Sequence, residues 1–312
     1  MSELIHVESL SKKFGGITAV DDLSFFVSRG EVYGFLGQNR AGKSTTIRML
    51  LTLIKPSDGA IHIFGKNIGT HRKDILQKTG AIIEKRDLYQ YLTAFQNLAI
   101  ISKLSGVRCT QKQLILQLEK VGIAERAHSK VKTFSQGMKQ RLGIACALIH
   151  NPELIILDEP TNGLDPQGIA DVRNLILHLS KQEGKTIFVS SHLLSEIELI
   201  ADSMLIIDKG RKVAEGKVKD LLNPADTLVQ IETANNEMTR RVLQQSQWIH
   251  SIQHSEPITL KMHKKEIPSL VKFLIEQNVE LLSIQPKHSL EDYFLSLTTS
   301  NQYVAAYKNR TL

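Results

Sequence analysis

The chain has 312 residues, 42% of them hydrophobic and 23% charged, and a formal net charge of +7. This length is sufficient for a full hydrophobic core and predicts two domains. No apolar run reaches the roughly 18 residues of a membrane-spanning helix, and the first residues lack the pattern of a secretory signal, so we expect a cytoplasmic chain. The basic residues are interleaved with acids and lack a ladder of stacking aromatic residues, so we expect a solvated basic surface and no nucleic acid partner.

Residues 1–222 alternate short apolar runs with longer periodic segments, which is typical of an α/β domain. Apolar runs at 5–7, 19–27 and 60–64 predict the strands of an N-terminal antiparallel portion. This portion surrounds the most informative segment of the chain.

That segment begins at residue 37 and reads GQNRAGKST, with the spacing G-x-x-x-x-G-K-[ST]. The apolar run 32–36 before it predicts a strand, and apolar residues at helical spacing over 45–54 predict a helix. Backbone N–H groups in such a turn and the helix N-terminus bind phosphate, and a lysine adds a full charge. A serine after the lysine is placed to bind Mg²⁺. We therefore predict a nucleotide site, rather than an ordinary glycine turn, made by Gly37, Gln38, Asn39, Arg40, Ala41, Gly42, Lys43, Ser44 and Thr45.

A mainly helical stretch is predicted at 92–122. Ser135 then precedes a second helix at 136–149, where a serine is a preferred N-cap residue. Any helix can begin with serine, so this segment is a weak signal by itself. Its position just ahead of an acidic strand makes it a strong one.

The acidic strand is the apolar run 154–157, which is followed by Asp158 and Glu159. In parallel sheets the carboxyl ends of the strands carry the chemistry. Asp158 suits a contact to Mg²⁺, and Glu159 suits orienting or deprotonating a water molecule. The alternative is a polar turn after a strand, and the phosphate loop upstream favours the functional interpretation.

After a helix near 168–182, the strand 186–189 ends in Ser190-Ser191-His192. A single histidine is more often a surface or core residue than a catalytic one. At the end of a second strand, however, His192 is placed to form a hydrogen bond with a terminal phosphate.

Beyond residue 222 the pattern changes, and we predict a small α+β accessory module over 223–300 and a polar tail over 301–312. The module is predicted from alternating strands and helices at 228–231, 237–245, 258–262, 267–277 and 281–284.

In this order the motifs resemble those of the ATP-binding subunits of ABC transporters, over roughly residues 3–220. The resemblance implies an ABC-type nucleotide-binding domain at 1–222, with an antiparallel β subdomain and a helical subdomain at about 88–150. Residues 37–45 would bind the phosphates of ATP. Asp158, Glu159 and His192 match the metal-associated acid, the catalytic base and the switch histidine of the family.

The resemblance also implies that two subunits pair around the nucleotide. Ser135, Gln136 and Gly137 match the signature segment that binds the ATP held by the other subunit. Asp165, in Gly163-Leu164-Asp165, matches the acid that contacts the dimer partner.

Two further roles are implied, and several positions depart from the family pattern. Phe14 matches the aromatic residue that stacks on adenine, although it also reads as an ordinary edge-strand residue. Glu84 stands where most members have a glutamine that touches Mg²⁺ and the membrane partner. Gln38 and Arg40 replace the usual proline and glycine. If residue 40 needs a positive φ, an arginine there costs about 1–2 kcal/mol.

The segments 80–84, 134–142 and 290–294, together with the accessory module, look like the peptide-antibiotic and drug-export branch, with bacitracin- and lantibiotic-resistance members as the nearest likeness. We therefore predict an ATP- and Mg²⁺-dependent ATPase that forms a homodimer and drives a separately encoded membrane permease from the inner face of the membrane. The expected cargo is an antimicrobial peptide or another amphipathic toxin.

Two alternatives remain open. A soluble ABC protein acting on ribosomes or DNA commonly carries two fused cassettes or coiled-coil insertions, and this chain shows one cassette and neither addition. A non-catalytic regulatory module would result if Arg40 prevented turnover.

Overall fold

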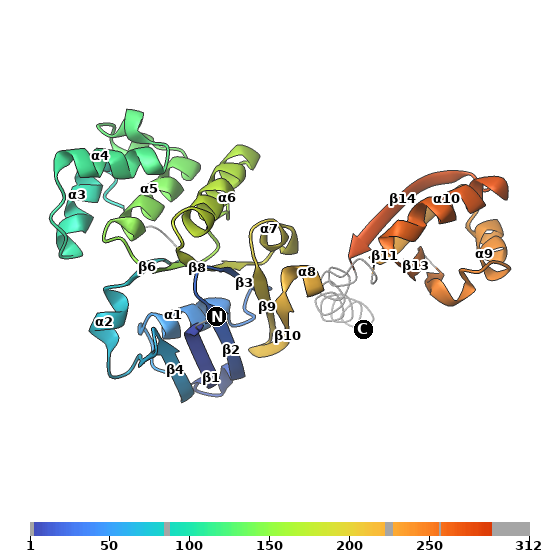
Figure 1. Ribbon diagram of the computed structural model, residues 1–312, viewed down its shortest axis with the longest axis horizontal. Helices are drawn as coiled ribbons and strands as arrows, with labels where there is room; N and C mark the ends of the chain where they lie inside the picture. The colour runs from blue at the N-terminus through green and yellow to red at the C-terminus, as the bar shows by residue number, and fades with distance from the viewer. Residues whose placement is uncertain (1–2, 84–87, 222–226, 256, 289–312) are drawn as a thin grey trace, which may run out of the picture. The chain divides into compact units, whose positions relative to one another are not determined.

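The computed structural model describes residues 3–83, 88–221, 227–255 and 257–288. The chain divides into two compact units, Met1–Val218 and Lys219–Leu312, and each has its own hydrophobic core (Figure 1). Among the described residues, no helix combines the length and apolar character that crossing a membrane requires.

The larger unit begins with a four-stranded sheet of order β2-β1-β4-β5. Its strands pair antiparallel, which confirms the predicted N-terminal portion; they are β1 (Glu3–Phe14), β2 (Ile17–Ser28), β4 (Asp58–Ile63) and β5 (Lys66–Asn67).

The second sheet has six strands in the order β10-β9-β3-β8-β7-β6. Five of them run parallel, and only β10 is antiparallel to its neighbour. Because β8 lies between β3 and β7, the carboxyl ends of these three strands meet at one edge. The strands are β3 (Val32–Gly37), β6 (Thr79–Ile82), β7 (Leu154–Leu157), β8 (Thr186–Ser191), β9 (Ser203–Asp208) and β10 (Arg211–Lys217).

Both sheets share one core. The rings of Phe25 on β2, Phe35 on β3 and Phe188 on β8 have centroids 5.3–6.1 Å apart, and all three side chains are buried. Close aromatic packing of this kind contributes beyond the area it buries. The strand that precedes the phosphate loop is therefore fixed from both sides.

Several helices of the larger unit begin with a side-chain cap. Thr93 and Thr110 form capping boxes at α3 and α4, and Ser135 caps α5; these three helices pack on one another, as the predicted helical stretch requires. In chain order the helices are α1 (Lys43–Leu50), α2 (Arg72–Leu76), α3 (Ala94–Leu104), α4 (Gln111–Lys120), α5 (Gln136–Leu148), α6 (Pro166–Lys181) and α7 (Leu194–Glu198), with 3-10 turns η1 (Ala124–Arg126) and η2 (Val131–Thr133). The short helix α8 (Val218–Leu221) begins at the last residue of this unit.

The smaller unit alternates strands and helices, which confirms its predicted α+β class. Its antiparallel sheet has the order β12-β13-β11-β14, the arrangement of a split βαβ fold in which each helix connects two strands that flank a third. The elements are β11 (Thr227–Thr233), α9 (Asn236–Gln244), η4 (Ile249–Ser251), β12 (Ile252–Ser255), β13 (Ile258–Met262), η5 (Lys264–Glu266), α10 (Ile267–Glu276) and β14 (Leu281–His288).

Some elements were not predicted, and others fall outside the described residues. β6 and β12 are four-residue edge strands, too short to show a clear alternation of apolar and polar residues. Residue Glu84, the segment 290–294 and the predicted polar tail at 301–312 lie outside the described ranges.

Candidate active site

The phosphate loop connects the fully buried strand β3 to α1. Gly37 and Gly42 leave no space for a side chain: a Cβ would lie 2.6 Å from the carbonyl oxygen of Ile207 at Gly37 and 2.7 Å from that of Ala19 at Gly42. Gly42 also has a φ of 111°, which a residue with a Cβ adopts only under strain. Close packing of the backbone therefore fixes the shape of the loop.

The residues between these glycines differ in exposure. Ala41 is buried and its N–H donates to the Gln38 carbonyl at 3.1 Å, whereas Asn39 and Arg40 are exposed. Arg40 has a φ of 70°, so the condition for strain stated from the sequence is met. Its guanidinium lies on the surface of the loop.

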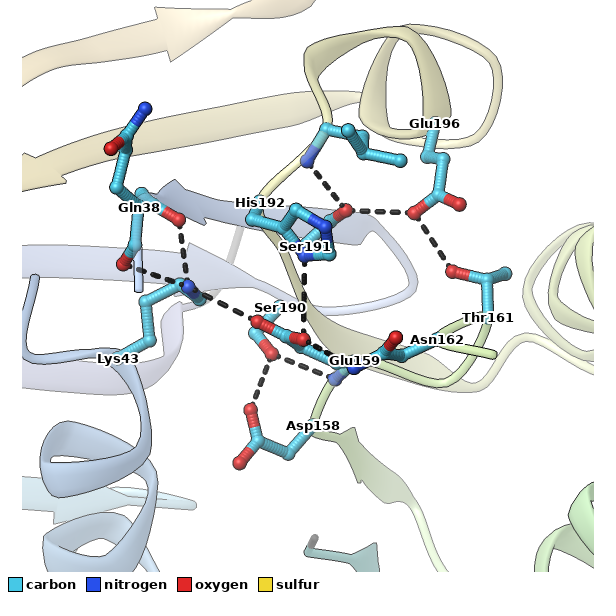
Figure 2. Close-up of polar contacts among 12 residues, drawn as sticks. Gln38, Lys43, Asp158, Glu159, Thr161, Asn162, Ser190, Ser191, His192 and Glu196 are labelled. Carbon is cyan, nitrogen blue, oxygen red and sulfur yellow. Dashed lines mark hydrogen bonds and ion pairs between the residues drawn. The ribbon is translucent and has the colours of Figure 1, made fainter. Parts of the chain in front are cut away.

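Lys43 is the first residue of α1 and is only 5% exposed. Its Nζ donates to the carbonyl oxygens of Gly37 at 2.7 Å and Gln38 at 3.1 Å, and lies 3.2 Å from Glu159 Oε1 (Figure 2). A buried ammonium group needs such partners to offset its loss of solvation. The structure thus brings the predicted phosphate-binding lysine and the predicted base into direct contact. Ser44 and Thr45 follow it on α1, both half-buried.

Asp158 and Glu159 follow β7 as predicted, and Ser190 of β8 joins them. The Ser190 hydroxyl donates to Asp158 Oδ1 at 2.5 Å and accepts the N–H of Glu159 at 2.9 Å. Glu159 has a φ of 47°, an uncommon conformation that persists where surrounding contacts hold it.

His192 faces Glu159 from the end of β8 (Figure 2). Its Nδ1 lies 3.3 Å from Glu159 Oε2, but this buried nitrogen makes no hydrogen bond within the described part of the chain. Asn162 Nδ2 donates to the same Oε2 at 3.1 Å. Buried polar atoms are normally satisfied. The polar group available to this nitrogen is therefore the Glu159 carboxylate.

The residues around Asp158 fit a hard divalent cation. Asp158 is 6% exposed and, among the described residues, forms no ion pair. A carboxylate and a hydroxyl such as that of Ser44 are ligand types that Mg²⁺ prefers, and Mg²⁺ is commonly held by one or two carboxylates together with substrate phosphates. In the described ranges no group of three or more His, Cys, Asp or Glu residues forms a metal site made by the protein alone.

The signature residues and Asp165 lie at two helix N-termini. Ser135 is exposed and caps α5 by accepting the Met138 N–H at 3.2 Å, while Asp165 is exposed and caps α6 by accepting the Gly168 N–H at 3.1 Å. The two helix starts approach each other, because a Cβ on Gly137 would lie 3.9 Å from the Cα of Gly168.

Gln136 is the first residue of α5 and is exposed. Phe14 ends β1, is 49% exposed and has Lys12 Nζ 5.0 Å from its ring centroid. Within the described residues, no hydrogen bond or ion pair connects Phe14 or Ser135 to Lys43 or Glu159. The structure therefore brings together the phosphate loop, the acids and the histidine, but not these two residues.

The sequence-based argument missed several polar residues that hold the site: Ser190, Thr161, Asn162 and Glu196. One signal was available. The buried strand β8 ends in two consecutive serines after an apolar run, and buried hydroxyls in a strand need partners. Nothing in the sequence indicates which partners these are.

The comparisons with known proteins agree with this geometry. A family model described as ABC transporter matches residues 20–162. The chain is 43% identical over 301 residues to the bacitracin transport ATP-binding protein BcrA of Bacillus licheniformis, covering 95% of this chain and 98% of the relative. It is 41% identical over 212 residues to the lantibiotic transport ATP-binding protein SrtF of Streptococcus pyogenes, covering 68% and 90%. A solved structure of an ATP-binding subunit of an ABC transporter superposes with a TM-score of 0.63 at 33% identity, covering 70% of this chain and 91% of that one.

Proposed function

Because this chain belongs to the ATP-binding subunits of ABC transporters, a family of ATPases, we propose that it powers the export of an amphipathic antimicrobial peptide through a separate permease. The fold is that of the family, and the domain binds nucleotide. The convergence of Lys43, Glu159 and His192 at one edge of the sheet supports the catalytic part of the proposal most directly.

In the proposed reaction the phosphate loop and Lys43 hold the phosphates of ATP. The ammonium, now paired with Glu159, would turn its charge to the phosphates, which leaves the Glu159 carboxylate free to accept a proton from the attacking water. Water attacks the terminal phosphorus, the bond to the bridging oxygen breaks, and ADP and phosphate are formed. His192, whose Nδ1 now faces the Glu159 carboxylate, would donate a hydrogen bond to the transferred phosphoryl group.

Asp158 and Ser44 are the residues proposed to hold Mg²⁺, as the fit of their oxygen atoms supports. The ion, when bound, would neutralise charge on the phosphates. Ser190 would hold the Asp158 side chain and the Glu159 backbone in place, because its hydroxyl donates to Asp158 and accepts the Glu159 N–H.

A second copy of the chain completes the proposed motor. The exposed residues Ser135, Gln136 and Asp165, together with the half-buried Gly137, would face the nucleotide bound by the partner, and Phe14 would stack on adenine. Binding of ATP between two subunits would draw them together, and hydrolysis would let them separate.

The cargo is proposed from the relatives, which transport bacitracin and lantibiotics according to their names. We extend this to an amphipathic peptide or related toxin, and place the chain on the inner face of the membrane through its permease. The finer assignment of cargo rests on the drug-export relatives, while the ATPase assignment rests on the site.

The experiment expresses the chain with its co-purifying permease in a sensitive bacterium and measures inhibition by bacitracin and a lantibiotic. We expect the wild type to raise the inhibitory concentration of at least one of these peptides and Glu159→Gln to give no protection at equal expression. Protection by the inactive variant would contradict an ATP-driven exporter.

A further inference from the structure

Glu196 lies on the short helix α7 and contacts both loops that carry the proposed catalytic groups. Its Oε2 accepts the Ser191 hydroxyl at 2.7 Å and the Thr161 hydroxyl at 2.8 Å (Figure 2). Thr161 is 35 residues earlier in the chain, so a single oxygen joins two distant segments. No ion pair of Glu196 exists among the described residues, so these hydroxyls are its partners.

The contacts of Glu196 flank the pair formed by Glu159 and His192. Ser191 precedes His192, and its Oγ also accepts the Leu193 N–H at 3.0 Å, so both neighbours of the histidine are tied to one network. Thr161 lies two residues after Glu159. The network therefore holds His192 and Glu159 at a fixed separation without touching either side chain.

The side of the network formed by Thr161, Ser191 and Glu196 is not filled by packed side chains. A pocket of about 260 Å³, which reaches the surface at the exposed Leu193 and Leu199, borders the network, and Thr161, Ser191 and Glu196 contribute to its lining. Its apolar walls come from Ile169, Ile176, Val189, Ile197 and Ile200. Atoms beside an empty space lose packing partners. On this side, the hydrogen bonds of Glu196 therefore contribute to the positions of the two loops.

We propose that Glu196 is a positioning residue that sets the distance between the base Glu159 and His192, an inference that rests on the proposed function. A carboxylate accepts two hydroxyl hydrogen bonds more strongly than a neutral amide. Loss of the carboxylate removes the link through Glu196 and leaves the contacts of Ser190 to hold the loop after β7 against the end of β8. The effect falls on turnover rather than on nucleotide binding, because the phosphate loop is fixed by its own backbone contacts.

The test measures steady-state ATPase kinetics and binding of a fluorescent ATP analogue by the full-length chain. Glu196→Ala should lower kcat on the order of 10-fold or more, because misplaced catalytic groups slow the chemistry. KM for ATP, analogue affinity and binding stoichiometry should stay unchanged. Glu196→Gln should retain activity within about threefold, because the amide oxygen accepts the same bonds more weakly. Ser195→Ala, an exposed change on the same helix, is the matched control and should be neutral.

Thr161→Val supplies an independent measurement, because it removes one of the two hydroxyls without changing Glu196. Alone it should lower kcat, and in the Glu196→Ala background it should add no further loss, since the bond is already absent. If Glu196→Ala does not fold, the Thr161→Val variant carries the test, and unchanged kcat in that variant overturns the proposal.

Glu159→Gln distinguishes a failure of the role proposed for Glu196 from a failure of the proposed ATPase mechanism. An inactive Glu159→Gln with a fully active Glu196→Ala overturns the role of Glu196 and leaves the ATPase mechanism intact. A Glu159→Gln variant with wild-type turnover overturns the proposed mechanism itself.

Discussion

The phosphate loop and the loops that follow β7 and β8 meet at one edge of the same sheet but are held in different ways. The phosphate loop depends on backbone packing, since Gly37 and Gly42 lie against carbonyl oxygens at distances that exclude a Cβ. The other two loops depend on side-chain hydrogen bonds from Ser190 and Glu196. Backbone packing gives a rigid surface, whereas hydrogen bonds between side chains leave alternative partners within reach.

This difference assigns different tasks to the two regions. A rigid loop of backbone donors with one buried lysine suits tight binding of phosphates. Loops joined by side-chain hydrogen bonds suit the positioning of the groups that act on the substrate. Changes in the phosphate loop should therefore affect binding and folding, and changes after β7 and β8 should affect turnover.

The largest expected effect tests the catalytic side of this comparison. Glu159→Gln should lower kcat by about 10²-fold or more, because a general base contributes this much and an amide cannot accept the proton. ATP affinity should remain, and size-exclusion chromatography with ATP should show a trapped dimer. Glu232→Gln, the same chemical change on an exposed position of β11, is the control. Wild-type turnover in Glu159→Gln would remove Glu159 as the base.

Lys43→Ala tests the binding side. Loss of a charged hydrogen-bond donor costs about 1.5–3 kcal/mol, so ATP affinity should fall roughly 10- to 100-fold. Titration with a fluorescent ATP analogue measures this, and the exposed Lys55→Ala serves as the control. Unchanged affinity would show that the loop does not bind phosphates as proposed.

Gly42→Ala should lower the free energy of unfolding of the larger unit by about 1–3 kcal/mol. An alanine is strained at this φ, and its Cβ would meet the Ala19 carbonyl. Gly65→Ala is a matched control: its φ of 71° is also positive, but nothing lies within 4 Å of its Cβ position. Urea denaturation of both variants isolates the close contact from the backbone strain. Equal losses of stability would contradict the packing argument.

Arg40→Gly is the expected exception to this comparison, because Arg40 is a strained, exposed residue of the phosphate loop whose replacement should change turnover more than binding. Removing the left-handed strain at Arg40 saves about 1–2 kcal/mol, but glycine loses more conformational entropy on folding. The stability of the folded chain should therefore rise only slightly. We expect a higher turnover rate and nucleotide affinity that is unchanged or modestly weaker. Steady-state kinetics decide this, with Arg40→Lys retaining both charge and strain. A lower kcat in Arg40→Gly would show that the guanidinium assists the reaction.

The smallest effect is expected from removing the second unit. A chain that ends at residue 222 should bind ATP with affinity within about twofold of the full length, because the described residues of the proposed nucleotide site lie within the compact unit Met1–Val218. Circular dichroism first establishes that the shortened chain is folded. Loss of ATP binding in a folded sample would give the second unit a place in the nucleotide site.

The sequence predicted those parts of the site that depend on local patterns. The phosphate loop follows from spacing and from its strand–turn–helix context, and Asp158, Glu159 and His192 follow from strand ends that a parallel sheet brings together. The α/β class and the α+β class of the second unit follow from periodicity. These features depend on residues that are close together in the chain, so they can be predicted without a structure.

Other features depend on segments far apart in the chain. Ser190 bonds to Asp158 across 32 residues, and Glu196 bonds to Thr161 across 35 residues, so sequence spacing does not indicate either contact. The positive φ at Arg40 is a backbone property that the side chain does not reveal. Edge strand β6 escaped prediction because four residues carry too little pattern.

The two serines that end β8 point to opposite faces of the sheet, as successive residues of a strand do, and they reach different carboxylates. The number of residues in β8 therefore determines which serine reaches which carboxylate. Deleting or inserting one residue within it would exchange the two hydroxyls, giving Asp158 and Glu196 each the wrong neighbour. The turn around Gly184, just before the strand, is less constrained, because a Cβ at Gly184 would meet nothing within 4 Å.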